Sequence, residues 1–142
     1  MTVGAAGGLN VILKTLLNPG DEVITFAPYF GEYRSYTNNF DGVLVAVSPH
    51  TVDFQPKLDE FEEKITPKTK AVIVNTPNNP TGTAYNEEDL RKIADLAVKH
   101  NIYVISDEIY EKLLYDGTHV SIASFNDEIK DLTIVVNGVA KA

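Results

Sequence analysis

The sequence contains no cysteine, which excludes disulfide bonds, iron–sulfur clusters and zinc sites with cysteine ligands. Basic residues are also scarce, because 12 Lys and Arg stand against 20 Asp and Glu, giving a formal net charge of −8. Binding to nucleic acid or to an anionic membrane needs clustered Lys and Arg, and the basic residues here are scattered. Small molecules are therefore the better class of partner, and we expect no nucleic-acid or membrane partner.

Long apolar stretches are missing too, because no run approaches the roughly 20 residues that a membrane-spanning helix needs. The N-terminal stretch MTVGAAGGLNVILKTLL does not fit a signal peptide: it lacks a basic start, Lys14 interrupts its apolar part and no small-residue cleavage site follows. We therefore expect a cytoplasmic protein. His50, His100 and His119 lie far apart without the spacing of metal ligands, so surface or packing roles explain them better and no metal site is expected.

What the sequence does contain is a regular alternation of apolar runs with helical patterns. At 142 residues, of which 44% are hydrophobic, the chain fits one globular domain, without repeat, low-complexity segment or linker. Glu87 to Lys99 is the clearest amphipathic helix, with Asn86 as its N-cap, and Lys57 to Ile65 predicts a shorter helix. The apolar runs, which read as buried parallel strands, are Glu22 to Phe26, Val43 to Val47, Ala71 to Asn75, Ile102 to Ser106 and Leu132 to Val136. The alternation predicts an α/β domain.

In such sheets, ligands bind at the carboxyl ends of the strands, so unusual residues are sought there. Gly4, Ala5 and Ala6 open the apolar stretch Leu9 to Leu17, and small residues at a helix start let backbone N–H groups close around an anion. A simple tight turn explains them equally well. The stretch APYFGEY, which contains Phe30, follows the first apolar run. Most aromatic residues in such positions serve packing. The alternative function for Phe30 is to hold its flat ring over a planar cofactor.

Two further strand ends carry polar motifs. In TPNNPTG the prolines fix the backbone, and Asn79 offers hydrogen-bond donors. In SDEIY, Asp107 and Tyr110 face the same way if Ser106 caps a helical turn. A helix-capping acid explains Asp107 equally well but leaves Tyr110 unexplained. The closing stretch VVNGVAKA contains Lys141, which is either a solvated residue or part of a site.

The motifs VGAAGGL, NPGDEVI, APYFGEY, NTPNNPTG, SDEIY and NGVAK occur in the order and approximate spacing of one known domain. Over essentially its whole length the chain resembles the large domain of class I/II aminotransferases that use pyridoxal 5′-phosphate (PLP), the fold type I family that includes aspartate aminotransferase. The resemblance implies a three-layer α/β/α fold with a mainly parallel sheet, in which residues 1–142 form part of a single PLP-binding large domain without the small domain. It also implies transfer of an amino group between an amino acid and a 2-oxo acid, and a homodimeric parent enzyme.

The resemblance gives each unusual residue a role. Lys141 is expected to carry PLP and, once the substrate amine displaces it, to act as general base and acid. Asp107 is expected to pair with the ring nitrogen, and Asn79 and Tyr110 to donate hydrogen bonds to the phenolate oxygen. The implied catalytic residues are Lys141, Asp107 and Tyr110. The remaining cofactor contacts are Phe30 against the ring and Gly4, Ala5 and Ala6 at the phosphate.

The sequence also departs from the family. Ala140 stands where the family commonly has a phosphate-binding serine, and the family segments with the phosphate and carboxylate arginines are not found. The two arginines, Arg34 and Arg91, fall in expected helices and read as solvated side chains. We therefore expect weak PLP binding and negligible transamination by this chain alone. We also expect self-association, because the strand Leu132 to Val136 is left unpaired at one edge.

The resemblance further predicts a sheet order: Leu132 to Val136, Ile102 to Ser106, Ala71 to Asn75, Glu22 to Phe26 and Val43 to Val47, all parallel. Three other functional interpretations stay open. The chain could be a non-catalytic module with the PLP fold, a carbon–sulfur lyase of the same fold, or an unrelated α/β binding protein.

Overall fold

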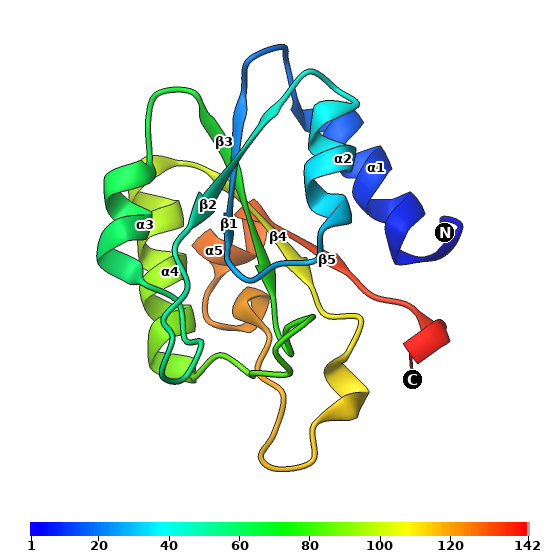
Figure 1. Cartoon of the computed structure of the whole chain (residues 1–142), viewed down its shortest axis with the longest axis vertical. Helices are drawn as coiled ribbons and strands as arrows, with labels where there is room; N and C mark the ends of the chain where they lie inside the picture. Colours follow the sequence, from blue (N-terminus) through cyan, green and yellow to red (C-terminus); the bar gives the residue numbers. More distant parts are fainter. Residues whose placement is uncertain (142) are drawn as a thin grey trace.

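A five-stranded sheet forms the centre of the computed structural model, which describes residues 1–141. Its strands are β1 (Glu22–Phe26), β2 (Val43–Val47), β3 (Thr69–Asn75), β4 (Tyr103–Asp107) and β5 (Thr133–Val136). Their order across the sheet is β2-β1-β3-β4-β5, and every pairing in the described sheet is parallel (Figure 1). The predicted strand order and direction are confirmed.

Helices cover both faces of this sheet (Figure 1). On one face lie α1 (Gly4–Leu16) and α2 (Glu32–Asn38), and on the other lie α3 (Leu58–Lys64), α4 (Glu87–His100) and α5 (Asp127–Leu132). Three short 3-10 helices complete the chain: η1 (Glu111–Leu113), η2 (Ile122–Ser124) and η3 (Val139–Lys141). This arrangement confirms the predicted three-layer α/β/α fold.

The core consists of two apolar clusters, one on each face of the sheet. Because side chains of a strand alternate between faces, neighbours in β4 belong to different clusters. Val104 packs in the cluster that contains Ile93 of α4, and Ile105 packs in the cluster that contains Leu13 of α1. The same alternation carries over to the polar residues that follow at the end of β4, and it separates the two acids there.

The helix α4 shows how the sequence sets its own boundaries. The Asn86 side chain accepts a hydrogen bond from the backbone N–H of Asp89 at 2.8 Å, which caps the first turn. Asn101, with a φ of 53°, ends the helix in the left-handed conformation. The face against the sheet consists of buried Leu90, Ile93, Ala94 and Ala97. The predicted helix is confirmed and extends one residue further.

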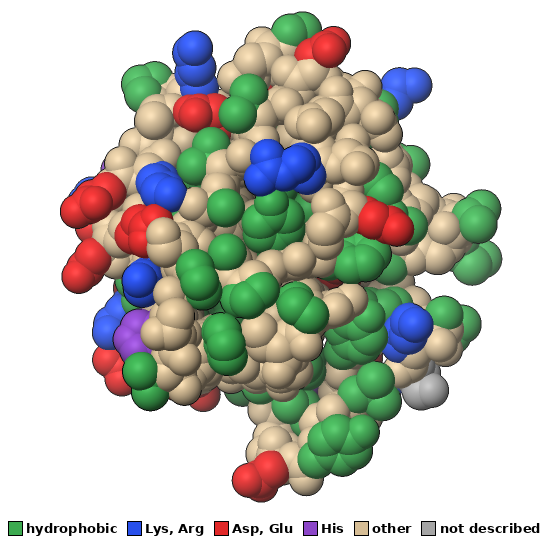
Figure 2. Space-filling view, in the orientation of Figure 1, with side chains coloured by type: hydrophobic (Ala, Val, Ile, Leu, Met, Phe, Trp, Pro, Cys, Tyr) green, Lys and Arg blue, Asp and Glu red, His purple; other side chains and the backbone are tan. Residues whose placement is uncertain are grey.

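The shorter predicted helix, 57–65, is α3, which begins one residue later and ends one residue earlier. Its buried residue is Phe61. Within the described part of the chain, no helix combines the length and apolar character needed to cross a membrane. Figure 2 shows basic side chains dispersed over one face of the molecule rather than gathered in a patch, so this face offers no surface typical of nucleic-acid binding.

Candidate active site

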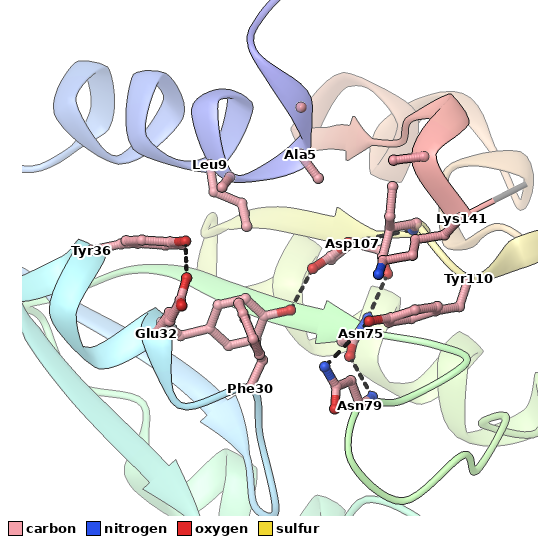
Figure 3. A pocket seen from close by; sticks show the side chains of 15 residues that line it. Ala5, Leu9, Phe30, Glu32, Tyr36, Asn75, Asn79, Asp107, Tyr110 and Lys141 are labelled. Carbon is pink, nitrogen blue, oxygen red and sulfur yellow. Dashed lines mark hydrogen bonds between the residues drawn. The ribbon is translucent and has the colours of Figure 1, made fainter.

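The carboxyl ends of the strands open into a cavity of about 240 Å³ (Figure 3). Its walls come from the start of α1, the β1–α2 connection, the ends of β3 and β4 and the turn η3. The residues predicted to form a site all line this one cavity: Gly4, Ala5, Ala6, Phe30, Asn79, Asp107, Tyr110 and Lys141. The structure therefore brings together residues that lie up to a whole chain length apart in the sequence.

The first turn of α1 forms one end of the cavity. Gly4 has a φ of +67°, a left-handed conformation that favours glycine, and it lies next to Ala5 and Ala6 at the helix start. In the described chain no side chain caps this helix, and no acidic residue lies in its first turn. The backbone N–H groups and the positive end of the helix dipole are therefore free to receive an anion.

A buried carboxylate forms another wall. Asp107 is the last residue of β4 and is only 5% exposed. Its Oδ2 accepts a hydrogen bond from the hydroxyl of Tyr33 at 2.5 Å, and its Oδ1 accepts a longer one, of 3.4 Å, from the backbone N–H of Ile109. Burial raises the pKa of Asp107, and these two hydrogen bonds oppose that rise. Burial, followed by the Asp107 charge, raises the pKa of Tyr33, so its hydroxyl stays protonated and donates.

A chain of amide hydrogen bonds joins the β3 and β4 ends. Asn75 is buried, its amide donates to the backbone carbonyl of Asp107 at 3.0 Å, and its side-chain oxygen accepts from the backbone N–H of Asn79 at 2.8 Å. The Asn79 amide in turn lies 3.3 Å from the hydroxyl of Tyr110 and donates to it. Asn75 thus fixes the relative position of the two side chains that reach the cavity from different loops.

Phe30 and Lys141 reach the cavity from the two remaining walls. The Phe30 ring packs edge-on against Tyr33, with centroids 5.6 Å apart and an interplanar angle of 84°. Figure 3 shows the side chain of Lys141 extending from η3 into the cavity, toward Asn75 and Tyr110. Lys141 as a residue is exposed, so a small molecule can reach its amine from solvent.

A comparison with known families decides the relationship. The model of the family "Aminotransferase class I and II" matches residues 1–142. The chain belongs to this family. A probable aspartate/prephenate aminotransferase of Aquifex aeolicus is 43% identical over 100% of this chain and 36% of its own length. The chain thus spans about a third of the length of the curated aminotransferases that it matches, including an aspartate aminotransferase of a Bacillus species at 44% identity and 36% coverage.

Solved aminotransferase structures support the same assignment. The aspartate aminotransferase of Thermus thermophilus, in a structure with maleate, superposes with a TM-score of 0.94 at 43% identity, covering 99% of this chain and 36% of that one. Bna3p of Saccharomyces cerevisiae, described as a putative kynurenine aminotransferase, gives a TM-score of 0.94 at 39% identity with the same coverage. The domain described here therefore has the same fold as the corresponding part of these aminotransferases.

One local expectation about this aminotransferase domain is wrong. Ser106 does not cap a helical turn, because it lies within β4 and its hydroxyl donates to the carboxylate of Glu108 at 2.9 Å. The next helical turn is η1, which begins at Glu111, after Tyr110. Asp107 and Tyr110 still face the same cavity, but the end of a strand and the turn after it place them there, not a common helix.

Tyr33 and Asn75 are among the cavity-lining residues that sequence reasoning missed, and they are the two whose side chains bond to Asp107. Tyr33 stands in the aromatic stretch APYFGEY, three residues after Phe30, which is the spacing of one helical face. Asn75 is the polar last residue of an otherwise apolar strand. Both signals are visible in the sequence, but only the folded chain shows that each side chain bonds to Asp107.

The arginines lie where the sequence placed them. Arg34, in α2, is exposed and donates to the hydroxyl of Tyr29 at 2.7 Å. Arg91, in α4, is exposed, pairs with Glu87 at 2.6 Å and lies 4.2 Å from the ring centre of Phe125. Neither arginine lines the cavity in the described structure, so neither is available there to a ligand.

Proposed function

We propose that this chain is the cofactor-binding part of a PLP-dependent aminotransferase, which transfers an amino group between an amino acid and a 2-oxo acid. One observation carries the proposal: Lys141, Asp107 and the Asn79–Tyr110 pair line a single cavity together with the uncapped start of α1. One PLP molecule needs these groups around it: an amine for its aldehyde, a carboxylate for its ring nitrogen, hydrogen-bond donors for its phenolate oxygen and an anion site for its phosphate.

The chemistry of this donor set fits PLP. The phosphate is suited to the first turn of α1, where Gly4, Ala5 and Ala6 offer backbone N–H groups without a competing acid. The buried carboxylate of Asp107 suits a protonated ring nitrogen. Tyr110 and Asn79 offer a hydroxyl and an amide to the phenolate oxygen, and the Phe30 ring suits the flat face of the cofactor.

When bound, PLP would supply an electron sink for the carbanion that forms at the substrate Cα. Lys141 would hold the cofactor through its amine until the amino acid displaces it. Its free amine would then take the proton from the substrate Cα and deliver it to C4′ of the cofactor, the carbon on the other side of the transferred nitrogen. Asp107 would keep the ring nitrogen protonated. Tyr110, held by the hydrogen bond from Asn79, would donate its hydroxyl to the phenolate oxygen and so orient the cofactor ring.

The substrate carboxylate needs a cation that this cavity does not provide. Among the described residues that line it, Lys141 is the one Lys or Arg, and its amine is committed to proton transfer. We therefore assign the carboxylate-binding group to other parts of the full protein, in line with a chain that covers 36% of its relatives. Transamination by this chain alone should be negligible. The homodimeric assembly implied by the resemblance and the cytoplasmic location expected from the sequence stay predictions.

Covalent trapping tests the proposal. The chain is incubated with PLP, its absorption between about 300 and 450 nm is recorded, and sodium borohydride makes any lysine attachment permanent before peptide mapping by mass spectrometry. We expect a phosphopyridoxyl label on Lys141, and its loss in Lys141→Ala. Lys112→Ala is the matched control, because Lys112 is an exposed lysine that does not line the cavity.

Equal labelling of the native chain and of Lys141→Ala would remove Lys141 from the mechanism. An unchanged absorption spectrum with no label at any concentration of PLP would overturn cofactor binding altogether and favour the non-catalytic interpretation. Measurable transaminase turnover by this chain alone would contradict the claim that the carboxylate cation lies outside it.

A further inference from the structure

Tyr33 makes the shortest contact to the buried carboxylate of Asp107, and it is not among the residues proposed to touch PLP. It comes from α2, 74 residues before Asp107, and is only 1% exposed. Its hydroxyl donates to Asp107 Oδ2 at 2.5 Å, and both residues line the cavity. The contact therefore joins the helical layer to the end of β4 at the wall of the cavity.

Tyr33 is the main donor that Asp107 has. Among the described residues, the other hydrogen bond to its carboxylate comes from the backbone N–H of Ile109 at 3.4 Å, which is long for such a bond. No lysine, arginine or histidine of the described chain makes an ion pair with Asp107. Oδ1 thus keeps capacity to accept a further hydrogen bond, and Asp107 lines the cavity.

The surroundings of Asp107 otherwise favour its neutral form. Burial raises the pKa of Asp107 most, and the charge of Glu108 raises it further, whereas the bond from Tyr33 lowers it. The other titratable groups that line the cavity are Glu32, Tyr36, Tyr110 and Lys141. A carboxylic acid that has taken up a proton would no longer hold a protonated ring nitrogen, so Asp107 needs a donor that keeps it ionised.

We infer that Tyr33 is a positioning residue for the cofactor: its hydroxyl holds the Asp107 carboxylate charged and turned so that its other oxygen faces the ring nitrogen of PLP. This inference rests on the proposed function, because it presumes that PLP occupies the cavity. It goes beyond that function by assigning the recognition of the ring nitrogen to a pair of residues from two layers of the fold.

A packing role for Tyr33 makes a different prediction. Its ring also packs against Phe30, so a merely structural Tyr33 would be replaced by phenylalanine without consequence for the ring nitrogen. Tyr33→Phe keeps the ring and removes the hydroxyl alone. Tyr36→Phe is the matched control: Tyr36 lies on the same helix and lines the same cavity, but its hydroxyl bonds to Glu32.

The experiment compares the dissociation constants of PLP, from absorption titrations between about pH 5.5 and pH 9, for the native chain and both variants. Hydrogen bonds to a charged group are strong enough that Tyr33→Phe should weaken PLP binding about tenfold near pH 6. Without Tyr33 the Asp107 carboxyl stays protonated to a higher pH, so the ratio of the two constants should shrink as the pH rises. Tyr36→Phe should follow the native profile.

Two further arms separate ring recognition from folding. A PLP analogue with carbon in place of the ring nitrogen should bind to the native chain and to Tyr33→Phe equally well, because it has no protonated nitrogen to donate a hydrogen bond to Asp107. In an Asp107→Asn background, Tyr33→Phe should cause no further loss. Circular dichroism of each variant verifies the fold.

A folded Tyr33→Phe that binds PLP with the native affinity at every pH would overturn the inference and leave the proposed function intact. The same holds if its loss of affinity is independent of pH or equal for the analogue, because the hydroxyl would then not act through the ring nitrogen. If the native chain does not bind PLP at any pH, the proposed function itself fails.

Discussion

Asp107 and Glu108 are adjacent acids of nearly equal burial, 5% and 4% exposed, yet they are held in opposite ways. Asp107 faces α1 and α2, has one short hydrogen bond and borders the cavity. Glu108 faces the other layer and accepts from three side chains: Ser106 at 2.9 Å, Ser121 at 2.6 Å and His119 at 3.0 Å. The strand alternation at the end of β4 directs the Asp107 carboxylate toward the cavity and the Glu108 carboxylate into hydrogen bonds on the other face of the sheet.

The difference shows which buried acid is available for binding. Side chains of the protein occupy both carboxylate oxygens of Glu108, and these bonds join the end of β4 to the segment that contains His119 and Ser121. Glu111 lies close enough that one ligand atom from each of Glu108, Glu111 and His119 falls within 4.8 Å of the others. Because both oxygens of Glu108 are already hydrogen-bonded, this cluster is best explained as a structural network that includes a packed histidine.

Removing the Glu108 carboxylate should have the largest effect on stability. In Glu108→Ala, three buried or half-buried donors lose their acceptor, and we expect the free energy of unfolding to fall by about 3 kcal/mol. Urea unfolding followed by circular dichroism measures the loss. Glu108→Gln is the matched control and should lose less than half as much, because its amide oxygen still accepts from the serines. Equal losses in the two variants would mean that cavity formation dominates, not the network.

Removing the negative charge of Asp107 should not lower the free energy of unfolding, in contrast to the loss of the Glu108 carboxylate. Asp107→Asn removes a buried charge, while its amide oxygen can still accept from Tyr33, so the unfolding free energy should stay the same or rise by about 1 kcal/mol. The pKa of Asp107 is raised in the folded state, so the native chain loses stability as the pH rises from the ordinary aspartate range through the folded pKa.

The advantage of Asp107→Asn over the native chain should therefore be largest at neutral pH and fade as the pH falls. Urea titrations of both chains over a pH series check this difference, and Glu108→Gln serves as the comparison. If Asp107→Asn destabilised the chain as strongly at neutral pH as Glu108→Ala does, the contrast between the two acids would be lost.

The sequence could predict this contrast only in part. The strand order and the common site of the cavity residues are implied by the family resemblance. Apolar runs and capping residues such as Asn86 depend on local spacing, so the strands themselves and the long helix α4 follow from patterns read along the chain. The partners of the two acids do not. Tyr33 and Asp107 are 74 residues apart, and the Ser121–Glu108 bond depends on a loop whose path no local pattern dictates.

The role given to Ser106 failed for the same reason. A serine before an acid is typical of a helix N-cap, and local reasoning could not tell that the strand continues through Asp107. Strand length is set by the neighbours: Ser106 and Asp107 pair with Val135 and Val136 of β5, and Glu108 donates its backbone N–H to the carbonyl of Val136. Tertiary pairing therefore decided against the cap.

The smallest effect should appear at that neighbouring strand. Within the described sheet β5 pairs with β4 alone, and Val135 is 44% exposed, so one edge of β5 presents backbone donors and acceptors to a second copy of the chain. We expect weak self-association that Val135→Lys reduces, because a charge on an edge strand opposes strand pairing between copies. Multi-angle light scattering over a concentration series measures the mass, and Val43→Lys, at an exposed position of the opposite edge strand β2, is the control.

Association through β5 would place the second copy beside the Glu108–Val136 bond, so it should leave the Tyr33–Asp107 pair and PLP binding unchanged. A clean monomer at high concentration, or an equal reduction by Val43→Lys, would contradict pairing at this edge.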